Sequence, residues 1–161
     1  MMRNIDYDRA LAINYAERWA LGRNPAYYNF DLLGGDCTNF VSQCVFAGCG
    51  VMNYTPETGW YYVDLNRRAP SWTSVGFFHR FLTTNRGTGP YARQVTRAEL
   101  RPGDVVQLGD GAGHFYHSLL VLSSSGAIYV AAHSYDALWR PLDSYRYGQI
   151  RYLHILGARG V

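Results

Sequence analysis

The stretch at positions 34–43 reads Gly34-Gly35-Asp36-Cys37-Thr38-Asn39-Phe40-Val41-Ser42-Gln43, and it decides the fold of this chain. Aspartate is a residue type that caps a helix N-terminus, and the apolar residues after Cys37 recur at three- and four-residue spacing. We therefore predict a helix that begins at the cysteine and ends near Gly48 and Gly50. A thiol in the first turn feels the positive end of the helix dipole, which lowers its pKa. The pattern indicates a reactive cysteine, although a buried structural cysteine would satisfy it too.

One helix is expected on each side of the cysteine helix. Asp6 or Asp8 can cap the first, whose apolar stripe of alanines and aromatics stops at Gly22. The other runs from Ser71 or Ser74 to about Thr84. Residues 51–70 between them show little periodicity, so we predict an irregular loop of the kind that often forms a lid or binding wall.

The second half of the chain has the pattern of strands. Four are predicted, at residues 105–108, 115–123, 127–133 and 149–156, separated by turns such as 101–104 and 124–126. Helices followed by consecutive short strands indicate an α+β domain in which an antiparallel sheet packs on helices. We predict that residues 1–161 form a single domain.

The composition indicates a globular protein and argues against several other classes. Apolar residues make up 48% of the 161 residues and charged residues 17%, which predicts a globular chain. The net charge of +3 is too small to indicate nucleic-acid binding, although every basic residue is an arginine. Three cysteines do not form a disulfide framework. No apolar run has the length of a membrane span, and the N-terminal stretch lacks the pattern of a signal peptide.

A cysteine nucleophile needs a base, and histidine is the usual one. His117 is the best candidate because it opens the apolar run of a predicted strand, where it can reach a helix start. His133 ends the neighbouring strand, and either it or Asp136 in the following turn is expected to orient the His117 ring. His114 should point to the opposite face of the strand, which argues against a zinc pair. No metal or other cofactor is expected.

Four segments together resemble a known family. They are Gly-Asp-Cys-Thr-Asn-Phe-Val-Ser-Gln at 35–43, Arg-Pro-Gly-Asp-Val-Val-Gln-Leu at 101–108, His-Ser-Leu-Leu-Val at 117–121 and Ala-His-Ser-Tyr-Asp at 132–136. In this order they resemble the bacterial putative amidase domain family, which is related to the NlpC-type and CHAP peptidoglycan hydrolases. The resemblance covers roughly Tyr7 to Leu156. It implies a papain-like fold and a cysteine amidase or peptidase that acts on cell-wall peptides.

The resemblance also implies roles for individual residues. Cys37 would be the nucleophile, His117 the general base and His133 the third polar residue. We expect the backbone N–H of Cys37 and the side chain of Tyr28 to hold the oxyanion. Asp36 would cap the helix or meet a substrate amine.

Further residues and other functions stay open at this point. Trp60 either lines the substrate groove or packs in the core. The same Cys-His machinery would serve a transpeptidase, a deamidase or a toxin effector. An inactive module that binds wall fragments is a third possibility. The expected partner is a cell-wall peptide or glycopeptide, and the family resemblance suggests action outside the cell or at the wall.

Overall fold

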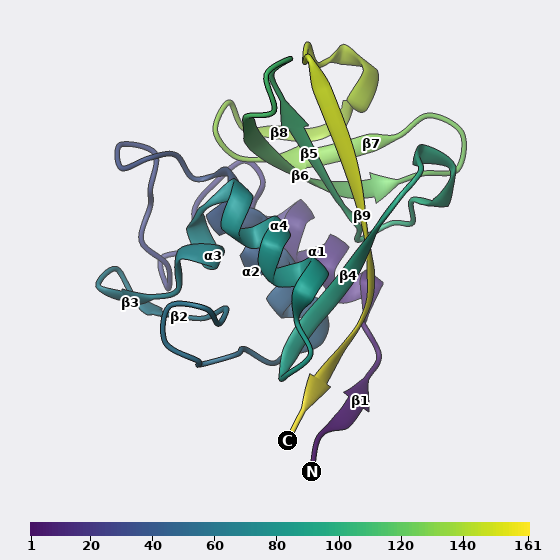
Figure 1. The fold of residues 1–161 in the computed structure, drawn as a ribbon. Coiled ribbons are helices and arrows are strands. Elements are labelled where there is room, and N and C mark those ends of the chain that lie inside the picture. The colour runs from purple at the N-terminus through teal and green to yellow at the C-terminus, as the bar shows by residue number, and fades with distance from the viewer.

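The computed structural model describes all of residues 1–161 and shows helices gathered against one side of a strongly twisted sheet (Figure 1). The helices are α1 (Arg9–Trp19), α2 (Cys37–Cys49), α3 (Pro70–Thr73) and α4 (Val75–Thr84). The sheet consists of β1 (Arg3–Ile5), β4 (Gly89–Val95), β5 (Val105–Gly109), β6 (Phe115–Ser123), β7 (Tyr129–Ala132), β8 (Ala137–Pro141) and β9 (Gln149–Gly160). The chain is therefore an α+β fold with N-terminal helices and an antiparallel sheet.

Strand β9 is the longest strand and pairs with three others. It pairs with β5 near its start and with β1 near its end, while β4 pairs with it along the other edge. The remaining strands follow in the order β5, β6, β7, β8, and every pairing is antiparallel. Figure 1 shows that β9 brings the C-terminus beside the N-terminus, far from β8.

The three predicted helices are confirmed, and local capping explains the start of α1 and the end of α2. Asp8 caps α1 by accepting a hydrogen bond from the Leu11 N–H at 3.1 Å. Helix α2 begins at Cys37 and stops at Gly50, whose φ of 72° is a left-handed conformation that suits glycine. The third helix is divided at Ser74, which has an extended backbone between α3 and α4.

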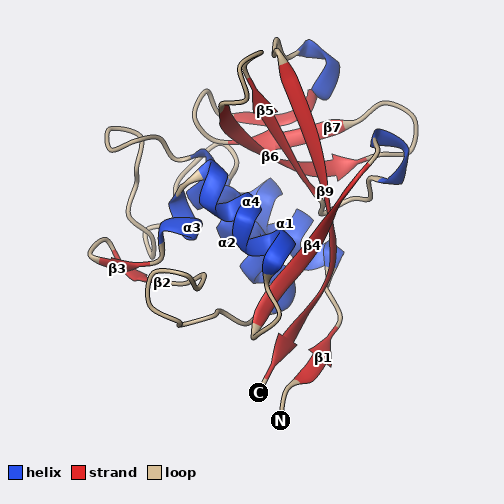
Figure 2. Cartoon of the chain, viewed as in Figure 1, coloured by secondary structure: helices blue, strands red, loops and turns tan.

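The four predicted strands are present as β5, β6, β7 and β9, and β9 continues beyond the predicted end to Gly160. Strands β1, β4 and β8 were not predicted from the sequence. The expected irregular loop at 51–70 contains a short hairpin of β2 (Tyr62–Asp64) and β3 (Arg67–Arg68), visible beside the helices in Figure 2. Two 3-10 turns, Arg97–Glu99 and Leu142–Ser144, complete the elements.

Both faces of the sheet are buried. The larger apolar cluster lies between helices and sheet and includes Phe40, Trp72 and Leu120. A smaller cluster covers the opposite face and includes Leu119 and Val121. Adjacent residues of β6 therefore enter different clusters, as the two-residue period of a strand requires. None of the helices combines the length and apolar character needed to cross a bilayer.

A buried aspartate ties the first helix to the sheet. Asp104, in the turn before β5, is fully buried and bonds to Arg9 of α1 and to His154 of β9, each at 2.8 Å. Its oxygens also accept hydrogen bonds from the backbone N–H groups of Arg101 and Ile155. His154, which has no partner evident in the sequence, therefore finds one across the sheet.

Replacement of Asp104 by alanine should destabilise the fold strongly. The change leaves the buried side of Arg9 and two backbone N–H groups without their acceptor, and breaking such a buried pair costs about 3–5 kcal/mol. Urea unfolding followed by circular dichroism measures the loss. Asp143→Ala is the matched control, because Asp143 pairs with Arg97 on the surface with 72% of its side chain exposed. Equal midpoints for the two variants would contradict the assigned role of Asp104.

Candidate active site

Cys37 is the one cysteine that solvent reaches. It is the first residue of α2 and is partly exposed, whereas Cys44 and Cys49 are buried and all three thiols are free. Cys44 belongs to the core, as its helical spacing predicts. Any thiol chemistry of the folded chain therefore belongs to Cys37.

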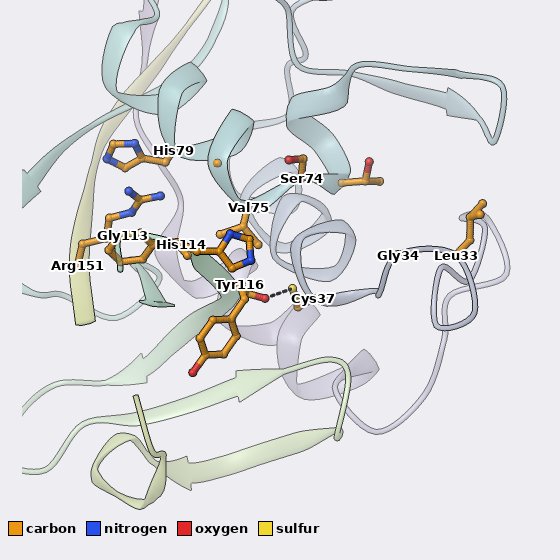
Figure 3. A pocket seen from close by; sticks show the side chains of 13 residues that line it. Leu33, Gly34, Cys37, Ser74, Val75, His79, Gly113, His114, Tyr116 and Arg151 are labelled. Carbon is orange, nitrogen blue, oxygen red and sulfur yellow. Dashed lines mark hydrogen bonds between the residues drawn. The ribbon is translucent and has the colours of Figure 1, made fainter. Parts of the chain in front are cut away.

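Two hollows meet at Cys37 and share Gly34, Cys37 and Tyr116 in their walls. The larger, about 750 Å³, is bounded by the start of α4, by residues 113–116 and by Arg151. Figure 3 shows Cys37 beside Tyr116 at this hollow, with His114, Ser74 and Val75 around it. The smaller, about 380 Å³, is lined by His117, the turn after β7 and residues of β8 and beyond. An extended ligand that crosses Cys37 would therefore occupy one hollow on each side.

The first turn of α2 is bonded to the sheet around Cys37. The Sγ atom lies 3.7 Å from the Thr38 hydroxyl and 3.9 Å from the Tyr116 carbonyl oxygen. Thr38 and Ser118 of β6 share a hydrogen bond of 2.9 Å between their hydroxyls, and Gln107 of β5 donates to Ser118. These bonds hold the thiol at the end of β6.

Asp36 occupies the N-cap position of α2 but does not cap the helix with its side chain. One carboxylate oxygen accepts from the Phe30 N–H and from the Asn39 amide, and the other bonds to His133 at 2.6 Å. Asp36 is only 1% exposed. The prediction of a capping bond is therefore wrong, and so is that of a contact with a substrate amine, because the carboxylate is sealed inside the protein.

His133 is the partner of Asp36 rather than of His117. Its Nδ1 faces the Asp36 carboxylate, and its Nε2 lies 2.8 Å from the Trp19 carbonyl oxygen. The ring also stacks on Phe40 with centroids 4.1 Å apart. Both ring nitrogens are engaged, which corrects the expectation that His133 orients His117.

The contacts of Asp36 determine the pKa of its carboxyl group. Burial raises the pKa of Asp36, but hydrogen bonds from His133, Asn39 and the Phe30 N–H outweigh burial and lower it below its ordinary value. Asp36 and His133 form a buried, hydrogen-bonded pair directly before Cys37.

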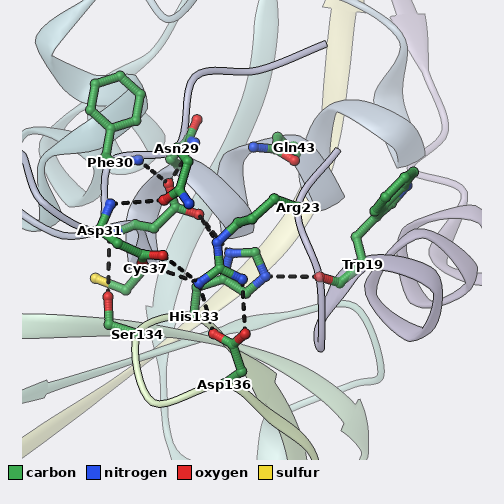
Figure 4. A network of polar contacts seen from close by, with 12 residues as sticks. Trp19, Arg23, Asn29, Phe30, Asp31, Cys37, Gln43, His133, Ser134 and Asp136 are labelled. Carbon is green, nitrogen blue, oxygen red and sulfur yellow. Dashed lines mark hydrogen bonds and ion pairs between the residues drawn. The ribbon is translucent and has the colours of Figure 1, made fainter. Parts of the chain in front are cut away.

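Asp136 forms its hydrogen bonds with Arg23 and not with His117. Both of its carboxylate oxygens accept hydrogen bonds from Arg23 at 2.9 Å. The same guanidinium bonds to Asp31 and lies 3.6 Å from Asp36 (Figure 4). Asp136 therefore fastens the turn after β7 to the end of α1, and the alternative that it orients His117 is corrected as well.

His117 lines the smaller hollow together with Cys37. Its ring lies 5.9 Å from that of Tyr145 and forms no hydrogen bond with another side chain. Burial, assisted by the charge of Arg140, lowers the pKa of His117 to about 4. The imidazole is therefore neutral near pH 7 and able to accept a proton.

Burial also raises the pKa of Cys37 above its ordinary value, and hydrogen bonds from Ser118 and Thr38 only partly offset it. The nearby Asp36 carboxylate raises it further. The depressed pKa predicted from the helix dipole is therefore wrong. Cys37 and His117 rest as a neutral thiol and a neutral imidazole, and not as an ion pair.

The two aromatic residues predicted to contact substrate lie elsewhere. Tyr28 packs its ring edge-on against Phe30 and lines neither hollow beside Cys37. Trp60 is fully buried and donates a hydrogen bond to Ser42, so packing is its role. Tyr28 is thus misplaced to hold an oxyanion, and Trp60 does not line the groove.

The walls of the hollows contain residues that sequence analysis did not select. They include Arg140, Arg146 and Arg151 as well as Tyr135, whose φ of 56° is unusual for a residue other than glycine. These residues follow no motif and come from separate segments.

His133 and Asp36 could have been recognised as a buried pair only from the hairpin register. No group of three or more His, Cys, Asp or Glu side chains is arranged to hold a metal ion.

Comparison with known proteins identifies the family of this chain. Residues 6–156 match the putative amidase domain family. The chain belongs to this family. The uncharacterized protein YhbB of Bacillus subtilis (strain 168) is 35% identical over 159 residues, which are 93% of this chain and 50% of YhbB. The uncharacterized protein YjcM of the same strain is 30% identical over 147 residues, which are 85% of this chain and 33% of YjcM.

This member of the putative amidase domain family thus spans half of one curated relative and a third of the other. No solved structure gives a significant match to the chain. The family match covers Asp36, Cys37, His117 and His133 in a single alignment.

Replacement of His133 by alanine should destabilise this family member substantially. Loss of the ring leaves the buried Asp36 carboxylate without its shortest hydrogen bond, and an unsatisfied buried charged group costs about 3 kcal/mol or more. Chemical unfolding at pH 7 provides the measurement. The control is His79→Ala, because His79 is half-buried and makes a single 3.2 Å contact with Gln94. A His133 variant as stable as the His79 variant would show that the Asp36–His133 pair does not hold the fold.

The protonation states predict how Cys37 reacts with iodoacetamide. Only the thiolate reacts, so the rate should rise about tenfold per pH unit from pH 6 to 8, without a plateau. Mass spectrometry of the intact chain follows the reaction, and buried Cys44 and Cys49 should stay unmodified. A rate that is already constant below pH 7 would instead indicate a resting thiolate–imidazolium pair.

Proposed function

We propose that this chain is a cysteine-dependent amidase or peptidase that cleaves an amide bond in bacterial cell-wall peptides through an acyl-enzyme intermediate. Cys37 is the proposed nucleophile and His117 the proposed general base. The proposal includes a papain-like arrangement, in which a cysteine at a helix N-terminus faces a histidine on the adjoining sheet.

One observation carries the proposal. The single partly exposed thiol, at the first residue of α2, opens into the same hollow as a neutral histidine with no competing side-chain hydrogen bond. A nucleophile and a base that share one cavity are the minimum requirement for covalent acyl transfer. Membership of the putative amidase domain family supports an amide as the bond that is broken.

The proposed reaction starts from the neutral pair. As the Cys37 sulfur attacks the amide carbonyl carbon, its proton passes to His117 and the carbonyl becomes an oxyanion. His117 then gives that proton to the leaving nitrogen as the carbon–nitrogen bond breaks, which leaves a thioester. Water attacks the thioester with His117 again as base, and the acid and the free thiol are released.

The start of α2 supports oxyanion stabilisation. Because the Asp36 side chain turns toward His133, no side chain caps the first N–H groups of the helix. The Cys37 N–H is the donor that we propose, and the helix dipole adds to its effect. Such a donor typically contributes about 3–4 kcal/mol in acyl transfer. The second donor expected from Tyr28 is withdrawn from the proposal.

The cell-wall substrate rests on the resemblance to peptidoglycan hydrolases and on the open hollows at Cys37. Together the hollows offer about 750 and 380 Å³, enough for several residues of a peptide on both sides of the thiol. A long groove of this kind suits a polymeric peptide better than a small free amide.

Digestion of purified bacterial peptidoglycan should release new peptide termini with the native chain and none with Cys37→Ala. Mass spectrometry of the products identifies the bond. His117→Ala should lower the rate by about a hundredfold or more, because it removes general acid–base catalysis. Asp143→Ala is the control, since Asp143 is exposed and lies outside both hollows.

Two outcomes would contradict the proposal. Products that persist in Cys37→Ala would exclude the thiol as nucleophile. An absence of products with the native chain, together with a Cys37 that stays unreactive toward iodoacetamide up to pH 9, would leave a binding module instead of an enzyme.

A further inference from the structure

The walls of both hollows at Cys37 carry positive charge and no acidic side chain. Arg151 lies in the larger hollow, and Arg140 and Arg146 lie in the smaller. None of these arginines forms a salt bridge, although other arginines of the chain do. The cleft is therefore more cationic than the chain's net charge of +3 suggests.

Arg151 is held in place by neutral groups. Its Nε donates to Gln107 at 2.9 Å, and its guanidinium carbon lies 3.7 Å from the centroid of the Phe115 ring. Burial and the charge of Arg151 lower the pKa of His79, so His79 is neutral at pH 7. Arg151 is thus a positioned cation whose two terminal nitrogens have no protein partner.

Arg140 has an equivalent setting in the smaller hollow. Its guanidinium carbon lies 3.7 Å from the centroid of the Tyr145 ring, and its Nε and Nη2 donate to the hydroxyl and the carbonyl of Ser144. No carboxylate pairs with Arg140, and its charge contributes to the lowered pKa of His117. Exposed Arg146 adds a second cation to the same wall.

Acidic groups close to the cleft bond to other residues and line neither hollow. Asp36 is paired with His133 behind the thiol, and Asp31 and Asp136 are paired with Arg23. An unpaired, partly buried guanidinium loses hydration without gaining a partner in the free protein. A ligand carboxylate supplies that partner, and guanidinium binds carboxylate through two parallel hydrogen bonds.

We propose that the cleft selects anionic peptides that carry a carboxylate on each side of the amide at Cys37, one bound by Arg151 and the other by Arg140. This inference rests on the proposed function for the position of the scissile bond. The charge selection itself can be tested in the absence of any cleavage.

The test uses the Cys37→Ala chain, which cannot turn over. Peptidoglycan fragments made soluble by a glycosidase are divided into two samples, and in one sample the carboxylates are converted to amides with carbodiimide and ammonia. Isothermal titration calorimetry should show binding of the native fragments at least about tenfold tighter than binding of the amidated fragments.

Single arginine substitutions test which side chains bind the carboxylates. Arg151→Gln and Arg140→Gln, each added to Cys37→Ala, should lose about tenfold in affinity for native fragments and almost none for amidated fragments. Arg151→Lys keeps the charge and should retain an intermediate affinity. Arg86→Gln is the control, because it removes the same charge from an exposed arginine outside both hollows. Thermal melting checks that every variant is folded.

The outcomes separate this inference from the proposed function. Equal affinity for native and amidated fragments, or equal losses in the Arg86 and Arg151 variants, would overturn the charge selection. If the active chain releases no products while Cys37→Ala still prefers native fragments, the proposed reaction is wrong and the charge selection stands. Products without any charge preference would show the reverse.

Discussion

The rest of the site depends on the buried hydrogen bond between Asp36 and His133. Asp36 directly precedes Cys37, and His133 directly follows β7, so their 2.6 Å bond joins the start of α2 to the sheet. The other nitrogen of His133 bonds to the carbonyl of Trp19 at the end of α1. One imidazole ring thus connects both long N-terminal helices with the sheet and helps to set the position of Cys37 relative to β6.

A second buried aspartate also joins a helix to the sheet. Asp104 connects α1 with β9 through Arg9 and His154, while Asp36 connects α2 with β7. Both carboxylates are buried and have several donors each, which is the condition under which a buried charge is tolerated. Apolar packing on the two faces of the sheet supplies the main driving force for folding. The aspartates determine how the helices are positioned on that sheet.

The charge of the cleft depends on which carboxylates are engaged by other residues. Asp36, Asp31 and Asp136 bond to His133 and Arg23. The walls of the two hollows therefore contain arginines and no acidic side chain. Burial, assisted by the charge of Arg140, keeps His117 neutral, and burial keeps Cys37 protonated. For the proposed reaction, this resting state favours proton transfer during attack over a preformed thiolate. In the proposed cleft, the arginines beside the thiol would bind the carboxylates of a peptide.

The sequence by itself determined the helices at Arg9–Trp19 and Cys37–Cys49, the main strands and the position of Cys37 at a helix start, because capping residues and apolar periodicity are local signals. The motifs read from it all lie within the residues that match the family. Only the tertiary structure decided the partners of Asp36, His133 and Asp136, since these depend on hairpin register and on side-chain direction across the sheet. Strands β1, β4 and β8 likewise form because neighbouring strands pair with them. The pKa values of Cys37 and His117 were decided by burial, which outweighs the helix dipole and cannot be counted before the chain is folded.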